Sequence, residues 1–147
     1  MRNKVLIDTN VLLDACMKER PNWEYANVLL DEIAYGNVDA FIVATSLKDV
    51  YYILTKYAGE AAARSFVRSA LDAFTVLPTD MAICRIAANS NEPDFEDGIV
   101  RACAESANID FIISRDEKAF AKSRIKRLSA KEYADLFCPA EEVLLEN

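Results

Sequence analysis

Four aspartates stand where predicted strands end or the next helices begin. Asp8 and Asp116 follow short apolar segments, whereas Asp49 and Asp97 lie in the first turns of predicted helices. The chain of 147 residues contains no His, and its four cysteines form no CxxC pair. Imidazole bases, Ser-His-Asp triads and thiolate zinc sites are therefore excluded. Any chemistry must use carboxylates, hydroxyls, amines or isolated thiols.

These four carboxylates would repel one another if the fold brought them together. Two like charges about 4 Å apart repel by ~4 kcal/mol at an effective dielectric of 20. That is a large share of a typical folding stability of about 5–15 kcal/mol, so such a cluster must hold protons or bind a cation. Oxygen ligands without His or thiolate favour Mg²⁺ or Mn²⁺, which commonly bridges phosphate oxygens. The pattern therefore indicates a divalent-metal site for phosphoryl chemistry.

The same acids also have a purely structural explanation as helix caps. Ser46 and Asp49 have the spacing of a capping box with Asp in place of Glu. Ser114 and Glu117 have the spacing of a complete capping box. Asp94 precedes a predicted helix as an ordinary N-cap, which leaves the carboxylate three residues later free for another role.

The elements that must position these residues alternate between strands and helices. Apolar, β-branched segments predict buried strands at residues 4–7, 41–43, 75–77, 111–113 and, more weakly, 125–128. Helical periodicity predicts helices that include residues 23–34, 50–57, 66–74, 83–87 and 99–107. This alternation predicts an α/β fold in one three-layer domain spanning 1–147, with helices on both faces of a mainly parallel sheet. Sites in such sheets form outside the carboxyl ends of the strands, where helices also begin.

The overall charge argues against a general coat for nucleic acid or for anionic membranes. Lys and Arg number 17 against 24 Asp and Glu, which gives a net charge of −7. The sequence contains neither a membrane-length apolar segment nor the apolar region of a signal peptide. We therefore expect a cytoplasmic protein without membrane association, in which the cysteines are reduced and mostly buried.

One basic segment, residues 115–131, reverses this balance. It carries seven basic and two acidic side chains, a net charge of +5, whereas the rest of the chain carries −12. Because it begins beside Asp116, it is a candidate surface for the phosphates of RNA, and an ordinary solvated surface is the alternative. The candidate contacts are Arg115, Lys122, Arg124 and Lys126.

Aromatic residues offer a second means of holding nucleic acid. The adjacent Tyr51 and Tyr52, and the pair Trp23 and Tyr25, could stack on nucleobases. Their helical spacing is more typical of core or interface residues. The C-terminal residues 141–147 mix apolar and acidic side chains, a pattern compatible with either a docking surface or a frayed end.

Three segments, taken in order, resemble the motifs of PIN-domain ribonucleases, a family that includes the VapC-type toxins of bacterial toxin–antitoxin pairs. The opening segment VLIDTNVLLD at 5–14 resembles the first motif of the family. The segments DFED at 94–97 and IISRDEKAF at 112–120 resemble its later motifs. The resemblance extends from residue 4 to about residue 136, and it implies a five-stranded parallel sheet.

The resemblance also implies a role for each acid. Asp8, Asp97 and Asp116 match the metal-binding acids of the family, and Asp49 matches a position where Glu is more common. Because Asp is one methylene shorter than Glu, the contact of Asp49 with a metal could run through water. The four acids together are the candidate catalytic residues, with Mg²⁺ or Mn²⁺ as the cofactor.

Smaller residues in these motifs match supporting positions. Asn10 and Ser114 match small polar residues that orient the first and last acids, and Asp94 is the third candidate for an orienting role. Gly98 stands where Ala is more common in the family. The implied function is metal-dependent endonucleolytic hydrolysis of RNA by a homodimeric toxin that an antitoxin protein blocks.

Three alternatives compete with this interpretation. A phosphatase of the haloacid-dehalogenase type also places Asp after its first strand, but it needs a second Asp where Asn10 stands. A receiver domain needs a mid-chain phosphoacceptor Asp and a late Lys, which Lys118 matches poorly. A catalytically weak or inactive binding module with the PIN fold stays open, because capping alone explains several of the acids.

Overall fold

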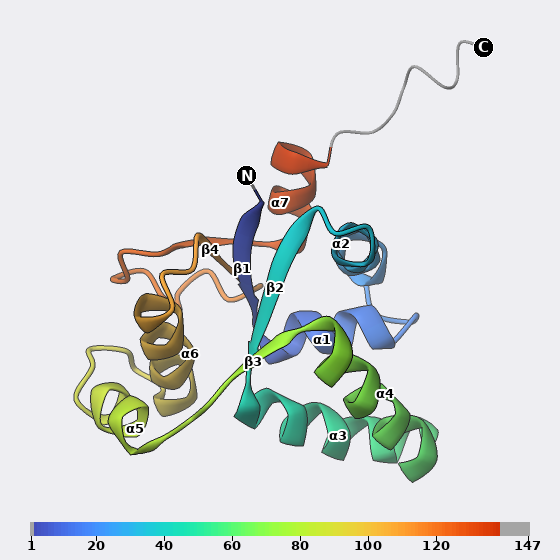
Figure 1. Ribbon diagram of the computed structural model, residues 1–147, viewed down its shortest axis with the longest axis horizontal. Coiled ribbons are helices and arrows are strands. Elements are labelled where there is room, and N and C mark those ends of the chain that lie inside the picture. Colours follow the sequence, from blue (N-terminus) through green and yellow to red (C-terminus); the bar gives the residue numbers. More distant parts are fainter. Residues whose placement is uncertain (1, 139–147) are drawn as a thin grey trace.

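A computed structural model describes residues 2–138 of the chain (Figure 1). Its sheet has five strands, all parallel, in the order β3-β2-β1-β4-β5. The strands are β1 (Asn3–Ile7), β2 (Val38–Val43), β3 (Thr75–Leu77), β4 (Phe111–Ile113) and β5 (Lys126–Leu128). All five predicted strands are confirmed, and the predicted α/β fold with them. Because β1 lies at the centre, the strand order reverses between β1 and β4.

Seven helices connect or follow these strands within residues 2–138. They are α1 (Thr9–Cys16), α2 (Trp23–Ala34), α3 (Ala44–Ala58), α4 (Glu60–Ala73), α5 (Met81–Ala88), α6 (Phe95–Ser106) and α7 (Ala130–Phe137). Five of them contain or overlap the predicted helical segments. Helices α1 and α7 were not predicted from the sequence.

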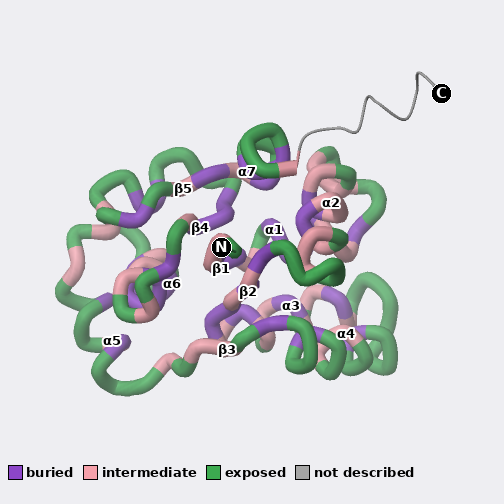
Figure 2. Tube along the Cα trace, turned by 45° about the horizontal axis from the view of Figure 1, so that its top comes forward, coloured by how far each residue is buried: buried purple, intermediate pink, exposed green. Residues whose placement is uncertain are grey.

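Alternate side chains of the central strands enter two separate hydrophobic cores. Val5 and Ile7 face one core with residues of α1, α2, α3, α4 and α7, whereas Leu6 faces the other with residues of α5 and α6. Figure 1 shows these two groups of helices on opposite sides of the sheet, and Figure 2 shows the buried strands between them. This period-two alternation produces the predicted three layers.

Three further expectations from the sequence concern membrane-spanning segments, the cysteines and the C-terminal segment. No helix in the part of the chain that the structure describes is both long and apolar enough to cross a membrane. The four cysteines all lie within residues 2–138 and are free, but only Cys103 is buried, so the expectation that they are mostly buried is wrong. The C-terminal segment 141–147, for which we expected a docking surface or a frayed end, lies outside the described residues.

Candidate active site

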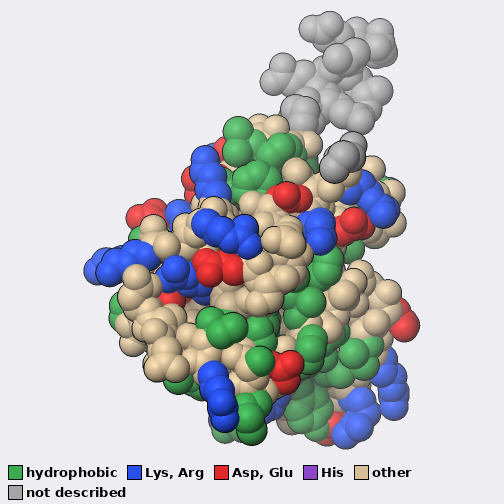
Figure 3. All heavy atoms as spheres, turned by 60° about the vertical axis from the view of Figure 1, so that its left-hand side comes forward, with side chains coloured by type: hydrophobic (Ala, Val, Ile, Leu, Met, Phe, Trp, Pro, Cys, Tyr) green, Lys and Arg blue, Asp and Glu red, His purple; other side chains and the backbone are tan. Residues whose placement is uncertain are grey.

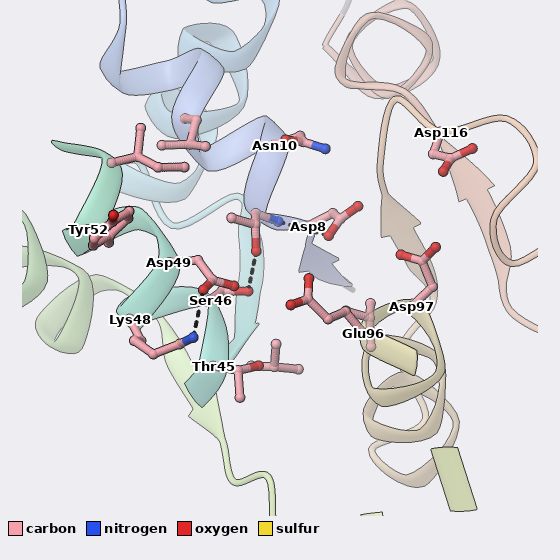
Figure 4. Close-up of a pocket in the computed structure, with 15 residues that line it drawn as sticks. Asp8, Asn10, Thr45, Ser46, Lys48, Asp49, Tyr52, Glu96, Asp97 and Asp116 are labelled. Carbon is pink, nitrogen blue, oxygen red and sulfur yellow. Dashed lines mark hydrogen bonds and ion pairs between the residues drawn. The ribbon is translucent and has the colours of Figure 1, made fainter. Parts of the chain in front are cut away.

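A pocket of about 600 Å³ opens at the carboxyl ends of β1 and β2 (Figure 4). It lies beside the position where the strand order reverses, as expected for a ligand site in a parallel sheet. The four predicted catalytic acids all line it, and they come from the end of β1, from α3, from α6 and from the loop after β4. The lining polar residues are Asp8, Thr9, Asn10, Thr45, Ser46, Lys48, Asp49, Tyr52, Glu96, Asp97 and Asp116.

Asp8 connects β1 to α1, and three hydrogen bonds fix its position. Its Oδ1 accepts a hydrogen bond from the backbone N–H of Thr9 at 2.9 Å, as the N-cap of α1. Its Oδ2 accepts a hydrogen bond from the Ser114 hydroxyl at 2.9 Å. The backbone N–H of Asp8 donates to the carbonyl of Ile113 at 2.9 Å. Burial raises the pKa of Asp8, although the hydrogen bonds from Ser114 and Thr9 act in the opposite direction.

The turn after β4 positions Asp116. The Ser114 Oγ accepts a hydrogen bond from the backbone N–H of Asp116 at 3.2 Å. Oδ1 of Asp116 accepts two backbone N–H groups of the following turn, at 3.0 and 3.2 Å. Residues 114–117 form no helix, so the predicted capping box of Ser114 and Glu117 is wrong. The hydroxyl of Ser114 instead joins Asp8 to Asp116.

Helix α6 presents Asp97 from its first turn. Oδ1 of Asp94 accepts a hydrogen bond from the backbone N–H of Asp97 at 3.1 Å, which confirms the predicted N-cap. Asp94 itself is not among the residues that line the pocket. Burial, followed by the negative charges of Asp8, Asp94, Asp116 and Glu92, raises the pKa of Asp97 to about 7. Burial and the neighbouring negative charges therefore both disfavour the charged form of Asp97.

Gly98 allows α6 to approach α5 closely beside this acid. A Cβ at residue 98 would lie 3.0 Å from the carbonyl oxygen of Ala87 and 3.1 Å from the Ser90 hydroxyl. The close packing explains glycine at a position where the resemblance leads us to expect alanine.

Asp49 faces the other acids from α3, on the opposite side of the pocket (Figure 4). Its Oδ1 forms an ion pair with the Lys48 Nζ at 3.0 Å. The N-cap of α3 is Val43, so Ser46 lies inside the helix and its predicted capping box with Asp49 is wrong. The buried Ser46 hydroxyl instead shares a hydrogen bond of 2.8 Å with the Thr9 hydroxyl, which ties α3 to α1.

The chemistry of these groups fits a hard divalent cation. The pocket offers carboxylate, hydroxyl and amide oxygens, and a cation would relieve the repulsion that raises the pKa of Asp97. Among the described residues, no three acidic or thiol side chains already lie close enough to enclose an ion. Mg²⁺ usually retains several waters and takes only one or two protein carboxylates beside substrate phosphates. The spacing therefore fits an ion that water and substrate help to coordinate.

Five polar residues of the lining were not expected at the site from the sequence, namely Thr9, Thr45, Ser46, Lys48 and Glu96, whereas Tyr52 was already a candidate for stacking on nucleobases. Glu96 precedes Asp97 in α6 and extends toward Asp8 and Asp49 in Figure 4. Lys48 and Tyr52 line the pocket from α3. Tyr52 lies three residues after Asp49 and four after Lys48, so the three side chains lie near one face of a helix, and this spacing could have indicated that they share a site.

Arg115 is the one predicted RNA contact that the structure brings close to the pocket. Its positive charge partly offsets the rise in the pKa of Asp8 that burial causes. Its Nε forms an ion pair with Oδ2 of the buried Asp14 at 2.9 Å, and Arg20 contacts the other oxygen of Asp14 at 3.3 Å. A buried carboxylate on α1 therefore holds Arg115 in place.

None of the other three predicted RNA contacts lines the pocket. Arg124 donates to the carbonyl of Glu105 at 2.7 Å, near the end of α6 that lies about 12 Å from Asp97. Lys126 begins β5, at the end of that strand away from the pocket, and the carbonyl of Lys122 accepts a hydrogen bond from Arg101. Figure 3 shows Lys and Arg side chains interspersed with acidic ones on this side of the molecule.

Solved structures with the same fold include components of toxin–antitoxin systems. A toxin–antitoxin complex from Klebsiella pneumoniae matches with a TM-score of 0.66 at 22% identity, over 86% of this chain and 97% of that one. FitAcB from Neisseria gonorrhoeae matches with a TM-score of 0.62 at 19% identity, over 86% and 98%. VapC20 from Mycobacterium tuberculosis, a toxin that cleaves the sarcin–ricin loop, matches with a TM-score of 0.64 at 15% identity, over 80% and 94%.

At these identities the structural similarity concerns the fold. No curated protein matches the chain in a direct sequence comparison. The sequence model of the PIN domain matches residues 4–118, which include all four candidate catalytic acids. The chain therefore belongs to the PIN-domain family.

Proposed function

We propose that the protein is a divalent-metal-dependent endoribonuclease and the toxin of a toxin–antitoxin pair. The observation that carries the proposal is the convergence of Asp8, Asp97 and Asp116 on one pocket at the strand ends, with the pKa of Asp97 raised to about 7. Carboxylates that repel one another in a pocket without His are suited to holding a cation. Membership of the PIN-domain family supports a nuclease.

In this proposal Asp8, Asp97 and Asp116 hold one or two divalent ions, and Asp49 assists from α3. A bound Mg²⁺ or Mn²⁺ supplies a water of lowered pKa and neutralises charge on the scissile phosphate. Ser114 keeps an oxygen of Asp8 at a fixed position through its 2.9 Å hydrogen bond. The hydrogen bond that the backbone N–H of Asp97 donates to Oδ1 of Asp94 fixes the first turn of α6.

Other polar groups in and near the pocket orient the substrate. Asn10 lines the pocket from the first turn of α1 and offers an amide to an acid or a phosphate. Arg115, anchored on Asp14, contacts a phosphate next to the scissile one. In a longer RNA, the proposed partners of Lys122, Arg124 and Lys126 are phosphates farther from the pocket.

The proposed partner is an antitoxin protein that covers the pocket, and the proposed assembly is a homodimer in the cytoplasm. The support is indirect: complexes with antitoxins occur among the proteins that share the fold, including the one from Klebsiella pneumoniae. A gene for a small DNA-binding protein beside the gene for this chain would support the pairing. Copurification of the two proteins would test it directly.

Cleavage of RNA by the purified protein, with Mn²⁺, with Mg²⁺ or with a chelator, tests the activity. We expect metal-dependent cleavage that Asp8→Asn and Asp116→Asn abolish and that Asp72→Asn, an exposed change on α4, leaves intact. Full cleavage by the first two variants would contradict the assignment. Release of phosphate from small esters without RNA cleavage would favour a phosphatase, and no metal-dependent effect would favour a binding module.

A further inference from the structure

Helix α3 carries a cationic and aromatic stripe along the edge of the pocket. Lys48, Tyr52 and Lys56 are spaced by four residues, so their side chains lie on one face of the helix. Lys48 and Tyr52 both line the pocket. The Nζ of Lys56 lies 4.3 Å from the centroid of the Tyr52 ring. We call these three residues the α3 stripe.

Tyr52 differs sharply from its neighbour Tyr51. Tyr51 packs against the larger hydrophobic core, and its hydroxyl donates to Glu60 while its ring lies 6.0 Å from the guanidinium of Arg64. Tyr52 belongs to neither core and is 60% exposed. Packing within the chain therefore accounts for Tyr51 but leaves a large, flat apolar face of Tyr52 beside the candidate active site.

The cations of the α3 stripe are better placed for phosphates at the pocket than several cations of the basic segment. Arg124, Arg127 and Lys131 have intramolecular partners, namely the carbonyl of Glu105, the carbonyl of Ser114 and the carboxylate of Asp135. Lys48 pairs only with Asp49 among the described residues, and its side chain is 76% exposed. Exposed ion pairs contribute about 0–1 kcal/mol, so a phosphate can displace this one.

We propose that the α3 stripe is a subsite for single-stranded RNA, in which a nucleobase stacks on Tyr52 and the flanking phosphates contact Lys48 and Lys56. The two lysines are about 12 Å apart along the helix axis, and the Nζ of Lys56 lies over one face of the Tyr52 ring, so the nucleobase stacks on the other face. Alternating cations and aromatic faces are the usual means of holding single strands without base-specific hydrogen bonds. The stripe leads the strand into the pocket, and this inference rests on the proposed nuclease function.

Fluorescence anisotropy with a short labelled oligouridine, in chelator and at low salt, tests the stacking without cleavage. Tyr52→Ala should raise the Kd at least about 5-fold, whereas Tyr52→Phe, which keeps the stacking face, should stay near wild type. The matched control is Tyr35→Ala, because Tyr35 is 76% exposed at the end of α2 and does not line the pocket. It should leave the Kd unchanged.

The salt dependence of binding tests the lysines. Lys56→Gln should lower the slope of log K against log salt by about 0.7, the value for one phosphate contact to a single strand. Equal Kd values for wild type and Tyr52→Ala, or no binding of the oligonucleotide by the wild type, would overturn the inference.

The outcomes separate this inference from the proposed function. Metal-dependent cleavage lost in Asp8→Asn, together with unchanged binding by Tyr52→Ala, would refute the stripe alone. Weakened binding by Tyr52→Ala in a protein that never cleaves RNA would support the stripe and refute the nuclease. A circular dichroism spectrum like that of the wild type would show that the variants fold.

Discussion

The Ser114 hydroxyl donates a fully buried hydrogen bond to Oδ2 of Asp8 at 2.9 Å, across 106 residues of sequence. The bond joins the ends of β1 and β4, the two strands between which the strand order reverses. The same hydroxyl accepts the backbone N–H of Asp116. One side chain therefore sets the relative positions of two acids that belong to different strands.

Replacing Ser114 by Ala removes this connection. We expect a loss of about 1.5–3 kcal/mol in the free energy of unfolding, since a buried carboxylate loses a charge-assisted hydrogen bond. RNA cleavage should fall by about tenfold or more, because outer groups that orient metal ligands usually matter to that extent. Urea unfolding and initial cleavage rates measure the two effects. Ser106→Ala, an exposed change on α6, should alter neither.

The raised pKa of Asp97 predicts how stability depends on pH. Its carboxyl binds a proton more tightly in the folded state, with a pKa of about 7, than at the ordinary value of 3.8. The stabilising effect of that proton is therefore complete below about pH 4 and is lost as the pH rises through 7. Without metal, Asp97→Asn should be more stable than wild type at pH 8, on the order of 1–2 kcal/mol after solvent screening, and similar to it at pH 4.

Thermal unfolding at the two pH values measures this difference, with Asp72→Asn as the exposed control. A divalent ion should reverse the order at pH 8, because it stabilises only a pocket that retains its negative charge. The Tm of the wild type should rise with Mn²⁺, and that of Asp97→Asn should rise much less. An equal rise in both proteins would show that Asp97 does not contribute to the site.

Replacing Gly98 by alanine should raise the helix propensity of α6 but crowd the contact between α6 and α5. Alanine is favoured over glycine inside a helix by about 1 kcal/mol. Its Cβ would meet the backbone carbonyl of Ala87 at 3.0 Å and the Ala87 Cβ at 3.2 Å, and backbone yields little. We expect Gly98→Ala to destabilise the protein by a net ~1 kcal/mol, because overpacking costs about 1–3 kcal/mol.

Ala62→Gly, on the exposed face of α4, measures how much the difference in helix propensity between alanine and glycine changes the free energy of unfolding without a change in packing. Both variants are compared by urea unfolding. An increase in stability for Gly98→Ala would mean that α5 and α6 can separate slightly, and that glycine is not required for their approach.

The pair formed by Asp14 and Arg115 should respond unequally to its two possible changes. Asp14→Asn should cost about 1.5–3 kcal/mol, because a carboxylate with 2% exposure loses its bonds to both Arg115 and Arg20. Arg115→Gln should cost less than about 1 kcal/mol, since Arg20 still contacts Asp14 and the Arg115 side chain is 40% exposed. Arg115→Gln should nevertheless weaken RNA binding.

Chemical denaturation and anisotropy measure these effects, and Arg64→Gln is the matched control. Arg64 forms an exposed ion pair with Glu60 on α4 and does not line the acidic pocket, so its loss should change stability by about 0.5 kcal/mol or less. Equal losses of stability in Asp14→Asn and Arg115→Gln would mean that Arg20 adds nothing.

Prediction from the sequence was strongest where local pattern decides structure. Short apolar, β-branched segments predicted all five strands, the fifth more weakly, and Asp94 was correctly expected as an N-cap because capping depends on a few adjacent residues. Local rules failed at Ser46 and Ser114. Each matched a capping box, yet each hydroxyl is bonded to a residue from a distant part of the chain, Thr9 or Asp8.

The sequence by itself determined the fold class and the candidate acids. The alternation of strands with helices and the order of the acidic motifs can both be read from neighbouring residues along the chain. Only the tertiary structure decided which side chains share the pocket. It added Glu96 and Lys48 to the lining, placed Tyr52 but not Tyr51 there, and turned Arg124 toward the far end of α6. These outcomes depend on how helices pack across the sheet and on contacts between residues far apart in the chain, which no local pattern records.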